Sequence, residues 1–118
     1  MSISIELREI GPITILDLAG ESSIMDGSSL QQTVRRLTRD GKLLFILNLR
    51  GMRHLDSFGL GQLVSTYIGV RELHGDVKIV HPVPSVRELL HYTRIDTVLQ
   101  VFPTEEEAVQ ELMKFAIT

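Results

Sequence analysis

The chain has 118 residues, of which 43% are hydrophobic and 23% are charged, and its formal net charge at pH 7 is −3. This length suffices for one domain with a hydrophobic core and is too short for two, so we expect a single domain over residues 1–118. The acidic balance argues against direct binding to nucleic acid, because neutralising phosphates requires a basic surface.

Further features exclude other classes of protein. The chain has no cysteine, so we expect no disulfide and a reducing compartment such as the cytoplasm. Its four histidines are scattered without metal-ligand spacing, so we expect no metal site. Residues 1–10 lack the apolar core of a signal peptide, and no apolar stretch approaches the roughly 20 residues that span a bilayer. One basic cluster is typical of the solvated face of a helix, and its members are Arg35, Arg36, Arg39 and Lys42.

The first part of the chain predicts two strands joined by a tight turn. Apolar and polar residues alternate over residues 3–7 and again over 13–18, and Gly11-Pro12 lies between them. A polar loop follows over residues 21–26, and either Asp26 or Ser28 is expected to cap a first helix. This helix should end near residue 41, and its expected buried side chains are Leu30, Val34 and Leu37.

A buried strand and an amphipathic helix come next. The run from Leu43 to Leu49 is almost entirely apolar, which indicates a strand covered on both faces. Asp56 is a good N-cap for a second helix running to about residues 74–75. Apolar residues recur along this helix at helical spacing, at Leu60, Leu63, Val64, Tyr67 and Ile68.

The rest of the chain alternates strands with helices. Strands are predicted over residues 77–80 and 98–102. Residues 81–85 break the first of these and open a third helix, with Val86, Leu89 and Leu90 inside. Residues 104–107 form a capping box before a terminal helix, which should bury Val109, Leu112 and Met113. The whole pattern predicts an α/β domain with a mixed sheet of about four to five strands and about four helices.

Ser57 is the residue with the most informative surroundings. Because Asp56 fills the capping role, the Ser57 hydroxyl in the first turn stays free. It is then a structural serine, a nucleophile, or the acceptor of a phosphoryl group. A phosphate there adds about −1.5 to −2 charges beside Asp56, which changes the surface potential more than the fold. Such a modification abolishes docking of a complementary protein without unfolding the chain.

Other chemistry at this position has less support. His54 lies three residues before Ser57 and is a candidate base, but the G-x-S-x-G pattern of a nucleophile elbow is absent. Gly59 and Gly61 lack the third glycine of a dinucleotide fingerprint, and no P-loop pattern exists. These glycines either let the helix pack close to the sheet or keep the turn open to a partner.

Several segments carry a resemblance to a known family. They are Leu47-Asn48-Leu49, Asp56-Ser57-x-Gly59-Leu60-Gly61 and Pro84-Ser85-Val86-Arg87-Glu88-Leu89-Leu90. Together they resemble the STAS domain of bacterial anti-sigma factor antagonists, and Gly20-Glu21 is similar to the family's G-E-L-D segment. The resemblance runs from the first strand to the terminal helix, and the D-S-x-G-L-G element is its most specific part.

The resemblance implies a partner-switching regulator that is not itself an enzyme and needs no cofactor. The unphosphorylated antagonist binds an anti-sigma factor, which is also an ATP-dependent serine kinase, and so releases the sigma factor. The kinase phosphorylates Ser57, which Asp56 positions, and a serine phosphatase resets the switch. The implied docking surface is formed by the loop and the helix start, at Glu21, Ser23, Asp26, Asp56, Ser57, Phe58, Gly59, Leu60 and Gly61.

The chain departs from the family pattern at two places. Phe58 stands where the family usually has Ser or Thr, and it is either a partner anchor or a cover for the core. Ser23 stands where the family segment has an acidic residue, a role for which Asp26 is a substitute. Two other functions remain open: a constitutive STAS scaffold of a signalling assembly or transporter ATPase complex, and an enzyme using Ser57 with His54.

Overall fold

The structure is a computed structural model that describes residues 3–21 and 29–117. Within these residues five strands form one sheet in the order β1-β2-β3-β4-β5. The elements follow one another as β1 (Ser4–Ile10), β2 (Ile13–Glu21), α1 (Ser29–Arg39), β3 (Leu44–His54), α2 (Ser57–Glu72), β4 (Asp76–Val80), α3 (Pro84–Tyr92), a 3-10 turn (Ile95–Thr97), β5 (Val101–Phe102) and α4 (Glu105–Ile117).

The sheet is mixed, as the sequence predicts. β1 and β2 are antiparallel and are joined by the turn at Gly11, whose φ of 56° suits glycine. β2, β3, β4 and β5 are parallel to one another, and a helix lies in each connection between them. A parallel pair requires such a crossover, which explains why the helices alternate with the strands. The predicted α/β class is therefore confirmed.

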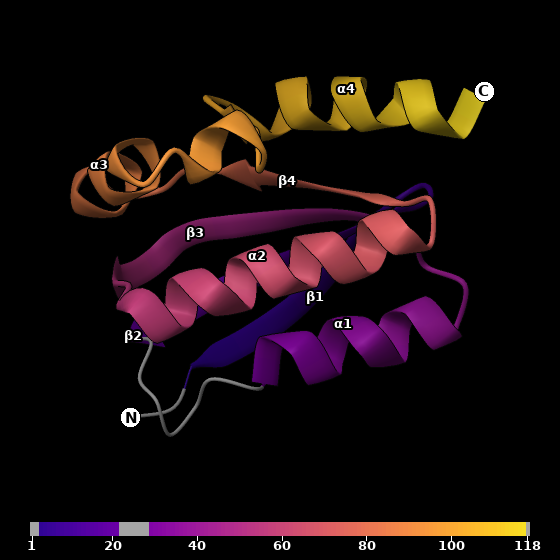
Figure 1. The fold of residues 1–118 in the computed structure, drawn as a ribbon. Coiled ribbons are helices and arrows are strands. Elements are labelled where there is room, and N and C mark those ends of the chain that lie inside the picture. The colour runs from indigo at the N-terminus through magenta and orange to yellow at the C-terminus, as the bar shows by residue number, and fades with distance from the viewer. Residues whose placement is uncertain (1–2, 22–28, 118) are drawn as a thin grey trace.

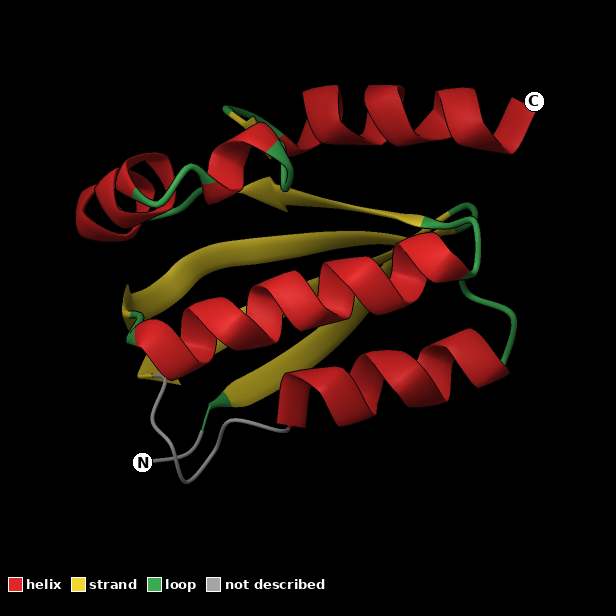
Figure 2. Ribbon diagram, viewed as in Figure 1, coloured by secondary structure: helices red, strands yellow, loops and turns green. Residues whose placement is uncertain are grey.

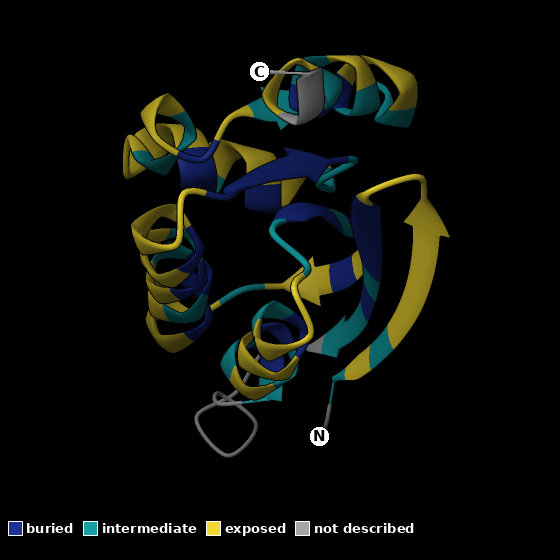
Figure 3. Cartoon of the chain, turned by 90° about the vertical axis from the view of Figure 1, so that its right-hand side faces the viewer, coloured by how far each residue is buried: buried dark blue, intermediate teal, exposed yellow. Residues whose placement is uncertain are grey.

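Helices cover both faces of the sheet. α1 and α2 lie side by side on one face, and α4 lies on the other (Figures 1 and 2). Phe45, Leu47 and Leu49 of β3 belong to the cluster under α1 and α2, whereas Leu44 and Ile46 belong to the cluster under α4. This double burial explains the apolar run of β3. The outer strand β1 is mostly exposed, as Figure 3 shows.

β3 extends five residues beyond the predicted end at Leu49, to His54. β4 pairs with Leu44–Asn48 only, whereas Gly51, Met52 and His54 pair with β2. The register shifts between Asp17 and Ala19, and a Cβ on Gly51 would lie 2.7 Å from the Leu18 carbonyl oxygen. Only glycine fits this close approach, so a residue that looks like a strand breaker in the sequence lies within a strand.

The predicted buried side chains of the helices are correct in part. Leu30, Val34 and Leu37 of α1 are buried, and so are Leu60 and Leu63 of α2. Val64, Tyr67, Leu89, Val109 and Met113 are half-buried, while Val86, Leu90 and Leu112 are buried. Ile68, which also belongs to the predicted helical spacing of apolar residues, is 51% exposed. It lies almost opposite the buried stripe of α2 that Leu63, Thr66 and Val70 form.

The predicted strand over residues 98–102 is shorter in the structure. Val98 and Leu99 are hydrogen-bonded to the 3-10 turn and not to β4, since both of their backbone N–H groups donate to the Ile95 carbonyl. Val98 is 55% exposed, and only Val101 and Phe102 pair with β4. The predicted cap of α4 is confirmed at its first hydrogen bond, in which the Glu107 N–H donates to Thr104 Oγ1 at 3.1 Å.

A polar cluster ties β1, β2 and β3 to α4. The Arg8 guanidinium donates to Asp17 at 2.6 and 2.8 Å and to Glu105 at 2.8 Å. Asn48 Nδ2 donates to Asp17 Oδ1 at 2.8 Å. The hydrogen bonds from Arg8 above all, and then the one from Asn48, hold the pKa of Asp17 below its usual value, although partial burial opposes them. We name Arg8, Asp17, Asn48 and Glu105 the Arg8 cluster.

Candidate functional site

The candidate site is the corner between β3 and α2. Asp56 has extended backbone geometry, with φ −90° and ψ 179°, and its Oδ1 accepts a hydrogen bond from the Gly59 N–H at 2.8 Å. Its carbonyl accepts the first helical bond, from the Leu60 N–H at 2.9 Å. The N-cap predicted at Asp56 is therefore confirmed, and α2 begins at Ser57 as expected.

Ser57 is the first residue of α2 and is exposed. Within the described part of the chain, its hydroxyl makes no hydrogen bond, and the Gly59 N–H donates to Asp56. The first N–H groups of a helix have no acceptor inside it, and they lie at the positive end of the helix dipole. The position is thus chemically suited to carry a negative group.

The predicted docking residues of α2 divide by burial. Asp56, Ser57 and Gly61 are exposed, and Phe58 is 41% exposed. Gly59 and Leu60 are buried, and Leu60 belongs to the core cluster beneath α1 and α2. A Cβ on Gly61 would meet no atom within 4 Å, so close packing against the sheet is not the reason for glycine there.

The remaining predicted docking residues belong to the segment that follows β2. Glu21 is the last residue of β2 and stands opposite His54 in the register with β3. The pairing therefore brings the start of this segment beside the strand that leads to Ser57. Ser23 and Asp26 lie outside the described residues.

Sequence reasoning did not find the basic residues of the extended strand. Arg50 and Arg53 are exposed on the part of β3 that leads to the corner, together with His54. The available signal was Met52, an apolar residue beyond Leu49 that is 3% exposed and packs in the same core cluster.

Other chemistry finds little support in the described residues. His54 makes no hydrogen bond to Ser57, so the pair does not form a catalytic dyad in this structure. Across residues 3–21 and 29–117, no group of three potential ligands could hold a metal ion. None of the helices described is long and apolar enough to cross a bilayer.

Known proteins resemble the chain in sequence and in fold. The family model described as "STAS domain" matches residues 4–108. The anti-sigma F factor antagonist of Paenibacillus polymyxa is 23% identical over 116 residues, which cover 95% of this chain and 97% of that protein. The solved structure of an anti-sigma factor antagonist from Mycobacterium paratuberculosis superposes with a TM-score of 0.83 at 21% identity, over 94% of each chain. Bacillus SpoIIAA in its phosphorylated form gives a TM-score of 0.70 at 18% identity, over 92% of this chain and 98% of that one.

Proposed function

This chain belongs to the STAS domain family, and we propose that it is an anti-sigma factor antagonist switched by phosphorylation of Ser57. In its unphosphorylated form it binds an anti-sigma factor that is also a serine kinase, and the sigma factor is thereby released. The kinase uses ATP to phosphorylate Ser57, the complex dissociates, and a serine phosphatase restores the first state. The chain itself catalyses nothing in this cycle, which takes place in the cytoplasm.

The observation that carries the proposal is the state of the Ser57 hydroxyl. It is on an exposed residue at a helix start, and its neighbour Asp56 is already bonded to the Gly59 N–H at 2.8 Å. A kinase can therefore reach the oxygen without breaking a hydrogen bond or opening the core. The names of the relatives agree with this role, since SpoIIAA is called an anti-sigma factor antagonist and has been solved with and without phosphorylation.

In this proposal, phosphorylation acts through the electrostatics of the corner. First-turn N–H groups of α2 stabilise a phosphate on Ser57, whereas the Asp56 carboxylate repels it. The two effects oppose each other, so the fold changes little. A partner that has desolvated this surface meets about two new negative charges, and the desolvation cost drives the complex apart.

The proposed docking surface combines an apolar anchor with an open backbone. Phe58 is 41% exposed and is the aromatic side chain nearest in sequence to Ser57. Gly61 leaves its side of α2 uncovered, which lets a partner approach the backbone closely. Glu21, Ser23 and Asp26 complete the surface in this proposal, while Gly59 and Leu60 support it from below.

The test is phosphorylation of the full chain by its cognate kinase with ATP. We expect one phosphate, located on Ser57 by mass mapping. Ser85 provides a matched control, because it is also exposed in the first turn of a helix, but the N-cap there is Val83 without a side-chain hydrogen bond. Ser85→Ala should leave labelling unchanged, and Ser57→Ala should abolish it while keeping the partner bound.

Binding measurements separate the switch from a constitutive scaffold. We expect the phosphorylated chain to lose at least tenfold in affinity for the kinase, and Ser57→Asp to lose less because a carboxylate carries less charge. Equal affinity of the phosphorylated and unphosphorylated chains would contradict the switch and favour the scaffold. Ester hydrolysis that depends on Ser57 and His54 would favour an enzyme instead.

A further inference from the structure

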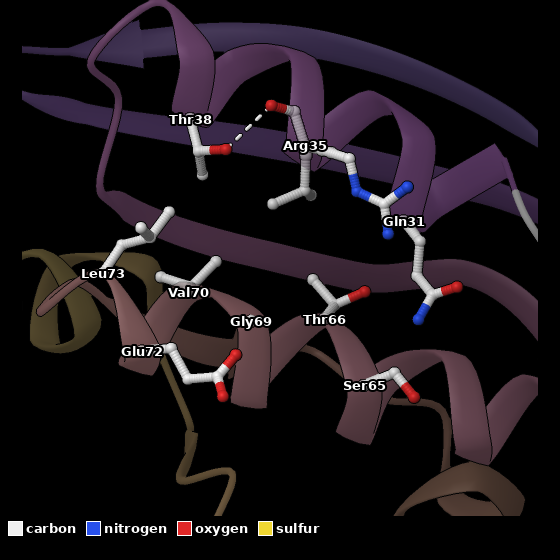
Figure 4. Close-up of a pocket in the computed structure, with 10 residues that line it drawn as sticks. Gln31, Arg35, Thr38, Ser65, Thr66, Gly69, Val70, Glu72 and Leu73 are labelled. Atoms are coloured by element: carbon white, nitrogen blue, oxygen red, sulfur yellow. Dashed lines mark hydrogen bonds between the residues drawn. The ribbon is translucent and has the colours of Figure 1, made fainter.

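A groove between α1 and α2 has the features of a ligand site. Its volume is about 220 Å³, and residues of both helices line it (Figure 4). This is smaller than the roughly 300–1,000 Å³ of sites for drug-sized molecules. The groove therefore suits a small metabolite.

One end of the groove carries hydrogen-bond donors that the described chain does not use. Thr66 is 4% exposed, and its buried hydroxyl has no hydrogen-bond partner among the described residues. Its side chain points across the groove towards α1, where the Gln31 amide and the Arg35 guanidinium lie at the same end (Figure 4). Neither the Gln31 nor the Arg35 side chain bonds another described residue.

This donor set indicates an anionic ligand. Guanidinium groups match carboxylates, since both are planar and can form two parallel hydrogen bonds. A hydroxyl that is buried without a partner destabilises the fold, and an acceptor brought by a ligand removes that cost. The carboxylate of Glu72 lies away from these donors, on the α2 side of the groove (Figure 4).

The rest of the groove is apolar and open. Val34 and Val70 are 3% and 1% exposed and form its floor, and Leu73 borders it with 49% exposure. Gly69 lies between Thr66 and Val70, in the interior of α2, where glycine is less favourable than alanine. A Cβ on Gly69 would meet no atom within 4 Å, so packing within the described chain does not require glycine there.

We propose that this groove binds a small carboxylate with a short apolar tail. The carboxylate accepts hydrogen bonds from Arg35, Gln31 and Thr66. The tail lies over Gly69 and Val70, in the space that the missing Cβ leaves open. The site is separate from Ser57, so it goes beyond the proposed switch and does not depend on it.

The probe for the test is 4-methylpentanoate, titrated into the full ¹⁵N-labelled chain while amide chemical shifts are recorded. We expect saturable shifts at Gln31, Arg35 and Gly69, with half-saturation at about 1 mM, as suits so small a ligand. Two related compounds test the contributions of the carboxylate and of the tail separately. 3-Methylbutylamine has the tail without the carboxylate, acetate has the carboxylate without the tail, and neither should saturate these shifts.

Matched variants locate the binding. Arg35→Gln should weaken it at least tenfold, whereas Arg36→Gln, one residue further on the exposed part of α1, should not. Gly69→Ala puts a methyl group into the space for the tail and should weaken ligand binding by a similar factor. Gly61→Ala, at another open position of α2, should leave the affinity for the ligand unchanged. The absence of saturable shifts up to about 20 mM, equal binding of the amine, or full affinity in Gly69→Ala would each overturn the proposal.

Discussion

The Arg8 cluster and the Ser57 corner are both polar, yet their groups are used in opposite ways. In the Arg8 cluster, Arg8 donates to Asp17 at 2.6 Å and to Glu105 at 2.8 Å, so three elements are held together by charges that neutralise one another. At the corner, Asp56 bonds only the backbone of its own helix at 2.8 Å, and the Ser57 hydroxyl stays unbonded within the described residues. Polar groups that satisfy one another build the fold, and those left to solvent are available for a switch.

The comparison implies that changes at the two places have different consequences. Removing Arg8 leaves the carboxylates of Asp17 and Glu105 without their shared cation, which lowers the free energy of unfolding. Removing the exposed Ser57 hydroxyl leaves nothing unsatisfied, so stability changes little while phosphorylation is lost.

The largest expected effect on stability comes from the core beneath the corner. Leu63 is 2% exposed and lies on the buried stripe of α2. Leu63→Ala should lower the free energy of unfolding by about 2–5 kcal/mol, because it loses buried surface and leaves a cavity. Urea unfolding followed by circular dichroism measures this. Ile68→Ala, at a residue 51% exposed on the same helix, should cost much less, and equal losses would contradict the burial described.

Arg8→Ala should have the next largest effect. It removes the cation shared by Asp17 and Glu105, and we expect a loss of about 1–2 kcal/mol, discounted because the Arg8 side chain is 44% exposed. Phosphorylation of Ser57 should proceed at an unchanged rate. A slower rate in a variant that is still folded would show that the two regions are coupled, and the comparison would fail.

Acid should weaken the same cluster more gently, because it neutralises the Asp17 carboxylate and leaves Arg8 in place. The pKa of Asp17 is lower in the folded chain than its ordinary value. At pH values between these two pKa values, the unfolded chain therefore binds more protons than the folded chain. The stabilisation is complete above the ordinary value of about 3.9 and is lost as the pH falls through the folded pKa. Urea unfolding at several pH values should reveal this slope. Asp17→Asn should lack it, and an unchanged slope would assign it to other groups.

The smallest of these effects is expected at the helix cap. Asp56→Ala removes the acceptor of the Gly59 N–H, which should cost about 1 kcal/mol. Asp56→Asn keeps an acceptor, so its free energy of unfolding should stay close to that of the wild type. Thermal unfolding measures both variants. The two variants also sharpen the role of the carboxylate at the switch. If only its capping oxygen matters, Asp56→Asn should be phosphorylated as fast as the wild type.

The corner could be predicted from the sequence because its signals are local. Asp56 precedes a helical apolar pattern, and the N-cap geometry depends on residues within one turn. The extent of β3 depends instead on pairing with β2, which lies far away in sequence, so the local apolar run predicts the strand only to Leu49. The predicted strand over residues 98–102 is shorter for a similar reason, since the N–H groups of Val98 and Leu99 donate to the 3-10 turn instead.

Burial on α2 is another feature that the sequence pattern does not determine. Ile68 has the same residue type as core positions, and only the helix orientation set by Leu63 and Val70 shows that it faces away. From the sequence, Phe58 is either a partner anchor or a cover for the core. Its 41% exposure keeps part of the ring available to a partner. The spacing of Gln31 and Arg35 carried no signal of a groove, because the opposite wall comes from another helix.

The unequal lengths of β3 and β4 have a consequence for motion. β4 pairs with β3 only as far as Asn48, so the segment from Gly51 to His54 that carries the corner is joined to β2 alone. A two-stranded ribbon at a sheet's end opens at a lower cost than the strands between two neighbours. The end of β3 that leads to Ser57 should therefore open more readily than the segment Leu44–Asn48.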